Sequence, residues 1–130
     1  MDCMVTKKKD LLLTHLDKTK PLCTQIVEQI CALIVNNKLK PGERLPSIRK
    51  IAEMVEVNPN TIQHAFDLLK KNNILTAIKG VGWFVCADIT KAEKLLKKII
   101  VEKTQEYISS MKVLGLSVEE IKEYVKEYKS

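Results

Sequence analysis

Residues 39–62 read LKPGERLPSIRKIAEMVEVNPNTI, and this stretch decides the fold that we expect. Pro41-Gly42 is typical of a turn, and Pro46-Ser47 is typical of a helix start a few residues later. Asn58 lies where a second helix would begin, so the stretch predicts two helices joined by a short turn. The apolar face of the first of these two helices is formed, at helical spacing, by Ile48, Ile51, Ala52 and Val55.

The second helix of the pair is predicted to begin with Asn58 as its N-cap and Pro59 as its first residue. Proline costs nothing at that position, because the N–H that it lacks would have no partner there anyway. The helix should end at Asn72-Asn73. Its buried face is expected to hold Ile62, Ala65, Phe66 and Leu69. Its outward face is expected to hold Asn60, Thr61, Gln63, His64, Asp67, Lys70 and Lys71.

A helix precedes this pair and a hairpin follows it. Pro21 begins a stretch with apolar residues at helical spacing, which predicts a helix that runs to Asn36 or Asn37. Residues 74–79 and 83–86 are rich in β-branched and aromatic residues, and the glycine turn Gly80-Val81-Gly82 joins them. The predicted order is therefore three helices and then a β-hairpin.

The remaining residues are purely helical in pattern. A helix is expected from 91 to 114, Gly115 ends it, and Ser117 with Glu120 forms a capping box that starts a last helix. Two amphipathic helices this short cannot form a core of their own, so their apolar stripes need a partner. The residues expected at a homodimer interface are Leu95, Leu96, Ile99, Ile100, Met111, Ile121 and Val125.

We expect the residues of this interface, apart from Leu96, to be exposed in a single chain, and this exposure is the physical reason to expect a dimer. The alternative is a monomer in which the two last helices fold back on their own domain. The expected fold class is mainly α with a small β-hairpin. It divides into an N-terminal extension at 1–20, a winged helix-turn-helix domain at 21–88 and a helical dimerisation segment at 89–130. In the extension, residues 11–16 fit a short strand or a helical stub, and the sequence does not decide between them.

Composition narrows the classes of function. The 130 residues include 22 Lys and Arg against 16 Asp and Glu, and the net charge of +6 suits a polyanionic partner without proving one. No apolar run is long enough to cross a bilayer and the N-terminus lacks a secretory pattern, so we expect a cytoplasmic protein. No nucleophile–base set, phosphate loop or metal cluster stands out, so we expect no enzyme, no cofactor and no metal. The cysteines have no metal-ligand spacing with the histidines and are expected to be reduced small hydrophobes: Cys3, Cys23, Cys31 and Cys86.

A helix-turn-helix with a glycine-turned hairpin suits binding in the major groove of DNA. The groove admits one α-helix, whose N-terminal end must present short polar side chains. The hairpin tip, with its bare glycine backbone, can approach the DNA backbone closely. The residues that we expect to contact DNA on this reasoning are Arg49, Asn60, Thr61, Gln63, His64, Lys79, Gly80 and Gly82.

Each of these residues has a plainer explanation. Asn58 and Asn60 would occur at any well-capped helix start, and Gln63 and His64 suit ordinary solvated positions. Arg49 has Glu53 four residues away and could form an ion pair with it on the helix surface. The DNA interpretation is favoured because all of these residues fall on one ordered scaffold.

The pattern resembles the DNA-binding domain of the GntR family over residues 21–86. Residues 39–49 (LKPGERLPSIR) resemble the family's signature turn and second-helix start. Residues 57–62 (VNPNTI) resemble the start of its recognition helix, and residues 80–85 (GVGWFV) resemble its wing. The three motifs occur in the family's order and at its spacing, so the resemblance is specific.

The resemblance implies an operator-binding repressor in which Ser47, Arg49, the start of the recognition helix at Asn58 and the wing glycines contact DNA. Two positions depart from the family. Trp83 stands where a small hydroxyl residue is usual, which could remove a phosphate contact or replace it with stacking. Gln63 stands where relatives often carry a basic residue, which allows a different base preference.

The tail, with residues 114–120 (LGLSVEE), resembles the short YtrA-type branch, as does the run at 13–17 (LTHLD). This resemblance implies two C-terminal dimerisation helices and, commonly, control of a transporter operon. A dimer would read a near-palindromic double-stranded operator with half-sites about one DNA turn apart, roughly 34 Å, or a multiple of that. The alternatives are a winged helix used as a protein-interaction module and a non-specific nucleic-acid binder. The sequence identifies no small-molecule effector.

Overall fold

The computed structural model describes residues 16–129. Most of the predicted N-terminal extension, including residues 11–15 and Cys3, lies outside the described residues. The chain divides into two compact units, one up to Leu96 and one from Lys97 onward, and each is considered by itself.

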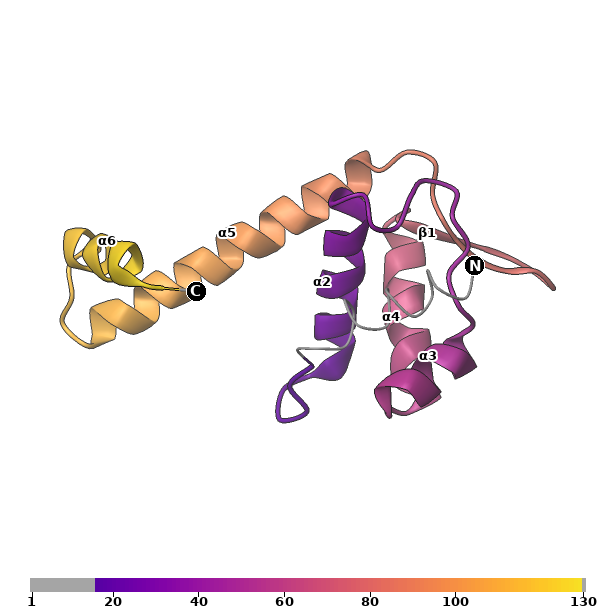
Figure 1. The fold of residues 1–130 in the computed structure, drawn as a ribbon, viewed down its shortest axis with the longest axis horizontal. Helices are drawn as coiled ribbons and strands as arrows, with labels where there is room; N and C mark the ends of the chain where they lie inside the picture. The colour runs from indigo at the N-terminus through magenta and orange to yellow at the C-terminus, as the bar shows by residue number, and fades with distance from the viewer. Residues whose placement is uncertain (1–15, 130) are drawn as a thin grey trace. The chain divides into compact units, whose positions relative to one another are not determined.

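The element order is the predicted one (Figure 1). Three helices come first: α2 (Leu22–Val35), α3 (Ile48–Val55) and α4 (Pro59–Lys71). The hairpin consists of β1 (Leu75–Ile78) and β2 (Gly82–Val85). Two more helices follow, α5 (Thr90–Val113) and α6 (Val118–Glu127). The predicted fold class, mainly α with a small hairpin, is confirmed.

Local capping fixes where the helices begin and end. The Ser47 hydroxyl accepts from the Lys50 N–H at 3.1 Å and starts α3, and the Asn58 side chain accepts from the Asn60 N–H at 2.8 Å and starts α4. Asn36 closes α2 with a side-chain bond to the Ala32 carbonyl at 2.8 Å. Each bond satisfies a helix-end group that would otherwise need water.

The core of the first unit lies where α4 packs against α2 and α3. The four predicted core residues of α4 are fully buried: Ile62, Ala65, Phe66 and Leu69. Burying a large aliphatic or aromatic side chain contributes about 1.5–3 kcal/mol, so this face holds the three helices together.

The hairpin is wider than the sequence predicted. Strands β1 and β2 pair antiparallel, with Leu75 opposite Val85 and Ile78 opposite Gly82. Residues 42–45 add a third segment on the other edge of β2, where Arg44 forms a bridge with Phe84. Backbone bonds on either side of that bridge join Val85 N to Glu43 O at 2.9 Å and Leu45 N to Trp83 O at 2.8 Å. The segment before α3 is thereby tied to the wing.

The first two turns of α5 belong to the winged unit. Ala92 is buried in the same core, and Leu95 and Leu96 pack against it. The division between the units falls after Leu96, inside α5, whereas the sequence pattern predicted it at residue 88. Leu95 is partly buried against its own domain, so it is less exposed in a single chain than expected.

In the second unit the chain turns at Gly115, which has the left-handed φ of 93° predicted for a helix stop. The Ser117–Glu120 capping box that starts α6 is present as predicted. Ile121 is only 4% exposed, so the expectation that it is exposed in a single chain is wrong. Val125, one turn later on α6, is 57% exposed.

Candidate nucleic-acid interface

The turn between α3 and α4 sets the geometry of the helix pair. Glu56 ends α3 in the left-handed conformation, with φ of 56°, and the Val57 N–H returns to the Ala52 carbonyl at 3.1 Å. Val57 packs against the core, which fixes the turn from the inside. On the outside, the Lys18 ammonium donates to the Glu56 carbonyl at 3.3 Å. A cation therefore lies at the turn that leads into α4.

The first turn of α4 combines a structural residue with exposed polar ones. Asn58 uses its side-chain oxygen to cap the helix, as expected of an ordinary N-cap residue. Asn60 is exposed, and Thr61 is half-buried. Asn58 is thus a residue that positions the helix start, whereas the Asn60 amide remains available for an outside partner.

Gln63 is held by a neighbour one turn along α4. Its Nε2 donates to the Asp67 carboxylate at 2.9 Å. Reading an adenine edge takes both the amide N–H and the amide oxygen of a glutamine. Gln63 would have to leave Asp67 to do so, whereas its oxygen alone can accept from a base donor without any rearrangement. This restraint by Asp67 was not predicted from the sequence.

His64 lies beside α2. It lines an open hollow of about 390 Å³ together with Cys23 of α2 and, from α4, Asp67, Leu68 and Lys71. His64 is nevertheless exposed, so it lies at the α2 edge of the outward face.

Arg49 and Lys50 project from the first turn of α3, and both are exposed. No salt bridge joins Arg49 to Glu53, so the predicted alternative of an internal ion pair is not formed. Ser47 uses its oxygen to cap α3 but keeps its O–H as a donor. The start of α3 thus presents a positive charge and a hydroxyl.

The wing tip is a tight turn in which the Val81 N–H donates to the Ile78 carbonyl at 2.9 Å. Lys79 and Gly80 form its exposed middle, and Gly80 has φ of 78°, a left-handed conformation that glycine adopts without strain. The Arg44 guanidinium crosses Gly82 and donates to the Val81 carbonyl at 2.6 Å. Arg44 lies within the motif at 39–49, but no role was predicted for it. Its partner lies far along the chain, and no local pattern reveals such a contact.

Trp83 points into the domain. It is half-buried, packs against the core and meets Phe66 of α4 edge to face. The indole ring therefore supports the wing from inside. The sequence analysis predicted that a tryptophan in place of the family's small hydroxyl residue would either remove a phosphate contact or stack on DNA, and the inward position of Trp83 does not favour stacking.

The residues predicted for the dimer interface fall into three groups. Leu95 and Leu96 pack against the winged core, and Ile121 is buried in its own chain. Ile99 and Met111 are half-buried. Ile100 and Val125 are more than half exposed. Further exposed apolar side chains, which were not predicted at the interface, are Val101, Tyr107, Val113, Leu114, Val118, Tyr124 and Tyr128.

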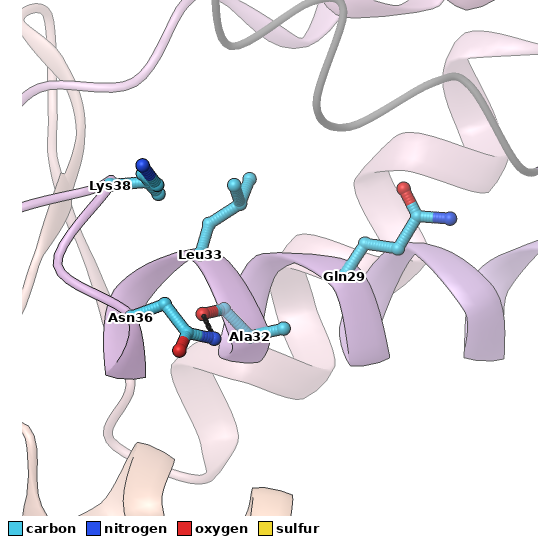
Figure 2. A pocket seen from close by; sticks show the side chains of 5 residues that line it. All are labelled: Gln29, Ala32, Leu33, Asn36 and Lys38. Carbon is cyan, nitrogen blue, oxygen red and sulfur yellow. Dashed lines mark hydrogen bonds between the residues drawn. The ribbon is translucent and has the colours of Figure 1, made fainter. Parts of the chain in front are cut away.

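A separate hollow of about 250 Å³ lies along α2. Figure 2 shows its lining, with Gln29 at one end, Lys38 at the other and Leu33 between them. The Gln29 side-chain oxygen is buried and has no hydrogen-bond partner among the described residues. The Asn36 amide nitrogen nearby is already bonded to Ala32.

Within residues 16–129 no group of three His, Cys, Asp or Glu could hold a metal ion, and no helix has the length and apolar character needed to cross a membrane. Burial raises the pKa of the Cys31 thiol to about 11, with a smaller contribution from Glu28, and burial also raises the pKa of Cys23 and Cys86. These three thiols are therefore protonated at neutral pH and poor nucleophiles.

Comparison with known proteins agrees with this geometry. Residues 22–85 match the family described as "Bacterial regulatory proteins, gntR family". The uncharacterized HTH-type transcriptional regulator YhcF of Bacillus subtilis is 34% identical over 85% of this chain and 91% of its own length. The HTH-type transcriptional repressor YtrA of the same organism is 30% identical over 82% of this chain and 83% of its own length.

Among solved structures, a GntR family transcriptional regulator from Listeria monocytogenes superposes with a TM-score of 0.76. It is 35% identical, and the match covers 87% of this chain and 99% of that one. The predicted resemblance is thus confirmed over both the winged domain and most of the helical tail. The chain belongs to the GntR family of bacterial regulatory proteins and is a DNA-binding transcriptional regulator of the short YtrA type.

Proposed function

We propose that this regulator is a sequence-specific repressor that binds a near-palindromic operator as a homodimer. The observation that carries the proposal is the outward face of α4. Asn60, His64 and Asp67 are exposed along it, and Arg49, which has no ion pair with any residue in 16–129, lies on the helix that precedes it. A polar helix face with an exposed cation on the preceding helix suits the edges of base pairs and the phosphates that flank them.

The proposed contacts divide into two kinds. Asn60, Thr61 and Gln63 read base edges from α4, with His64 at the margin of the groove. Arg49 forks onto guanine or onto a phosphate, since its guanidinium can donate two parallel hydrogen bonds. Ser47, Lys79, Gly80 and Gly82 contact the DNA backbone, and Asn58 holds the start of α4 in place.

The proposed dimer uses the apolar side chains that the second unit leaves exposed. Ile100, Tyr124 and Val125 are each more than half exposed, which is unfavourable for apolar groups in water. A second copy would cover them, with Ile99 and Met111 at the edge of the contact. Leu95, Leu96 and Ile121 have less apolar surface left for a second copy to cover, because their own chain already packs against them.

The relative YtrA is named a repressor, which supports repression as the output here. The resemblance to the short branch further suggests a transporter operon as the target and the cytoplasm as the place of action. Two other functions lead to different observations: a protein-interaction module would not select DNA, and a non-specific binder would bind any duplex equally.

Selection of bound duplexes from a random DNA pool tests the proposal directly. We expect an enriched sequence with two inverted half-sites about 34 Å apart, or a multiple of that. Affinity for this duplex and for a scrambled one is then compared across a salt series. A sequence reader keeps a ratio of about 10³ or more at physiological salt. Equal affinity for the two duplexes would contradict sequence-specific binding, and no enrichment at all would favour the protein-interaction module.

A further inference from the structure

We propose that Arg44 is a further DNA-contacting residue, held beside the wing tip so that its guanidinium binds a backbone phosphate. The inference rests on the proposed operator binding and adds a contact that neither the resemblance nor the family match assigns.

The backbone of Arg44 is fixed by the sheet. The residue forms the bridge with Phe84, and the backbone bonds of Glu43 and Leu45 to β2 hold it on both sides. The side chain then extends toward the wing tip, where its Nη2 donates to the Val81 carbonyl at 2.6 Å. A long flexible side chain is thereby held in one conformation before any partner arrives, which lowers the entropy cost of binding.

Gly82 provides the space for this arrangement. A Cβ atom built on Gly82 would lie 3.0 Å from the Arg44 Nε and 3.4 Å from its Nη2. The φ of 149° at Gly82 would also strain any other residue. By contrast, a Cβ atom on Gly80 meets nothing within 4 Å. The passage of Arg44 across Gly82 is therefore a structural reason for a glycine at this position, in addition to the close approach to DNA that the sequence suggested.

The charge of Arg44 remains available to a partner. A guanidinium has five N–H donors, and the contact with Val81 uses one of them. Arg44 is exposed and has no salt bridge to any residue that the structure describes. Residues 74–86 contain no Asp or Glu, and their one charged residue is Lys79 at the tip. A guanidinium that is held in place, has no ion pair among the described residues and lies at a wing without acidic residues is a favourable arrangement for a phosphate.

The test compares the affinity of four variants for the selected operator across a salt series. Arg44→Gln removes the charge, and we expect roughly a tenfold or greater loss of affinity. We also expect a salt slope that is shallower by about 0.9 for each phosphate that the variant no longer neutralises. Arg44→Lys keeps the charge but cannot donate two parallel hydrogen bonds. Its salt slope should therefore stay close to that of the wild type, and its loss of affinity should be smaller than that of Arg44→Gln. Gly82→Ala should displace the guanidinium and resemble Arg44→Gln.

Lys40→Gln is the matched control. It removes one positive charge from the same segment, but at the end of β2 remote from the wing tip, where the Gly42 N–H bonds to the Val85 carbonyl. We expect it to leave affinity and slope nearly unchanged. Thermal unfolding of each variant shows whether a loss of affinity accompanies a loss of fold. If Arg44→Gln does not fold, Arg44→Met, which also removes the charge, replaces it with the same expected loss of affinity and the same shallower slope.

The outcomes separate the inference from the proposed function. If the wild type prefers its operator and Arg44→Gln binds it with the same affinity and slope, Arg44 makes no phosphate contact and only the inference fails. A loss of affinity with an unchanged slope would also overturn it, because Arg44 would then serve the wing alone. A wild type without sequence preference would contradict the proposed function itself.

Discussion

The indole ring of Trp83 meets the ring of Phe66 edge to face, with 5.1 Å between the ring centroids and 71° between the ring planes. Phe66 is the fully buried centre of α4, and Trp83 belongs to β2 of the wing. The contact joins the two parts of the molecule that are proposed to touch DNA. The position of the wing relative to α4 is therefore set by core packing, before any DNA is bound.

A double-mutant cycle measures this contact. Replacing Phe66 and Trp83 by Leu, singly and together, should give a coupling of about 0.5–1.5 kcal/mol in the free energy of unfolding, the usual range for an aromatic pair. Urea denaturation of the four proteins provides the values. Phe84→Leu combined with Phe66→Leu is the control, since Phe84 is half-buried on the same strand but makes no ring contact with Phe66. Equal coupling in both cycles would contradict a specific role for the ring pair.

Operator binding should depend on Arg49. Because Arg49 is exposed and not paired with Glu53, Arg49→Ala should leave the fold intact and weaken operator binding by about 1–3 kcal/mol. Fluorescence anisotropy with the selected operator measures the loss, and thermal unfolding checks the fold. Glu53→Ala is the control: without an ion pair to break, it should not weaken binding. An Arg49→Ala protein with wild-type affinity would remove Arg49 from the interface.

The sequence predicted the helix starts well because caps act locally. Ser47, Asn58 and Ser117 each bond to a backbone N–H two or three residues ahead, so the signal and its consequence lie within one turn. The four buried residues of α4 followed from periodicity for the same reason. Most of the proposed DNA contacts could be located because they lie on these well-marked elements.

Contacts between distant segments could not be predicted. The bridge of Arg44 with Phe84 joins residues that lie far apart in the sequence. Neither the third segment of the sheet nor the hydrogen bond from the Arg44 guanidinium to the Val81 carbonyl was therefore expected. The apolar stripes of α5 and α6 posed a similar difficulty. Periodicity shows that Leu95 and Ile121 need cover, but it does not say whether their own chain or a partner supplies it. The structure shows that their own chain covers Ile121 and part of Leu95.

The exposure of each apolar residue in the single chain decides which substitutions test the proposed dimer. Ile100 and Val125 are 54% and 57% exposed, so Ile100→Asp and Val125→Asp should fold as single chains and yet prevent association. Sedimentation velocity should show monomers, and affinity for a full operator should fall to near that for a half-site. Ile121→Asp is different, because a charge placed at a buried position destabilises the chain itself. Dimers that persist in both Ile100→Asp and Val125→Asp would contradict the proposed interface.

The capping box at α6 predicts a measurable pH dependence. Glu120 accepts from the Ser117 N–H at 3.0 Å, and Ser117 accepts in return from the Glu120 N–H at 3.2 Å. Hydrogen bonding by Ser117 lowers the pKa of the Glu120 carboxyl below its ordinary 4.5. The Ser117 backbone N–H makes the larger contribution and the Ser117 side chain the smaller one. Because the pKa is lowered on folding, the ionised Glu120 carboxylate stabilises α6 at pH values above its ordinary pKa. This stabilisation is lost as the pH falls through the lower pKa of the folded state. NMR titration should therefore give Glu120 a midpoint below 4.5 in the wild type. Ser117→Ala should return this midpoint toward 4.5 and reduce the stability of the chain by about 1 kcal/mol. A wild-type Glu120 midpoint that is not lowered, and that Ser117→Ala does not change, would show that the box does not form in solution.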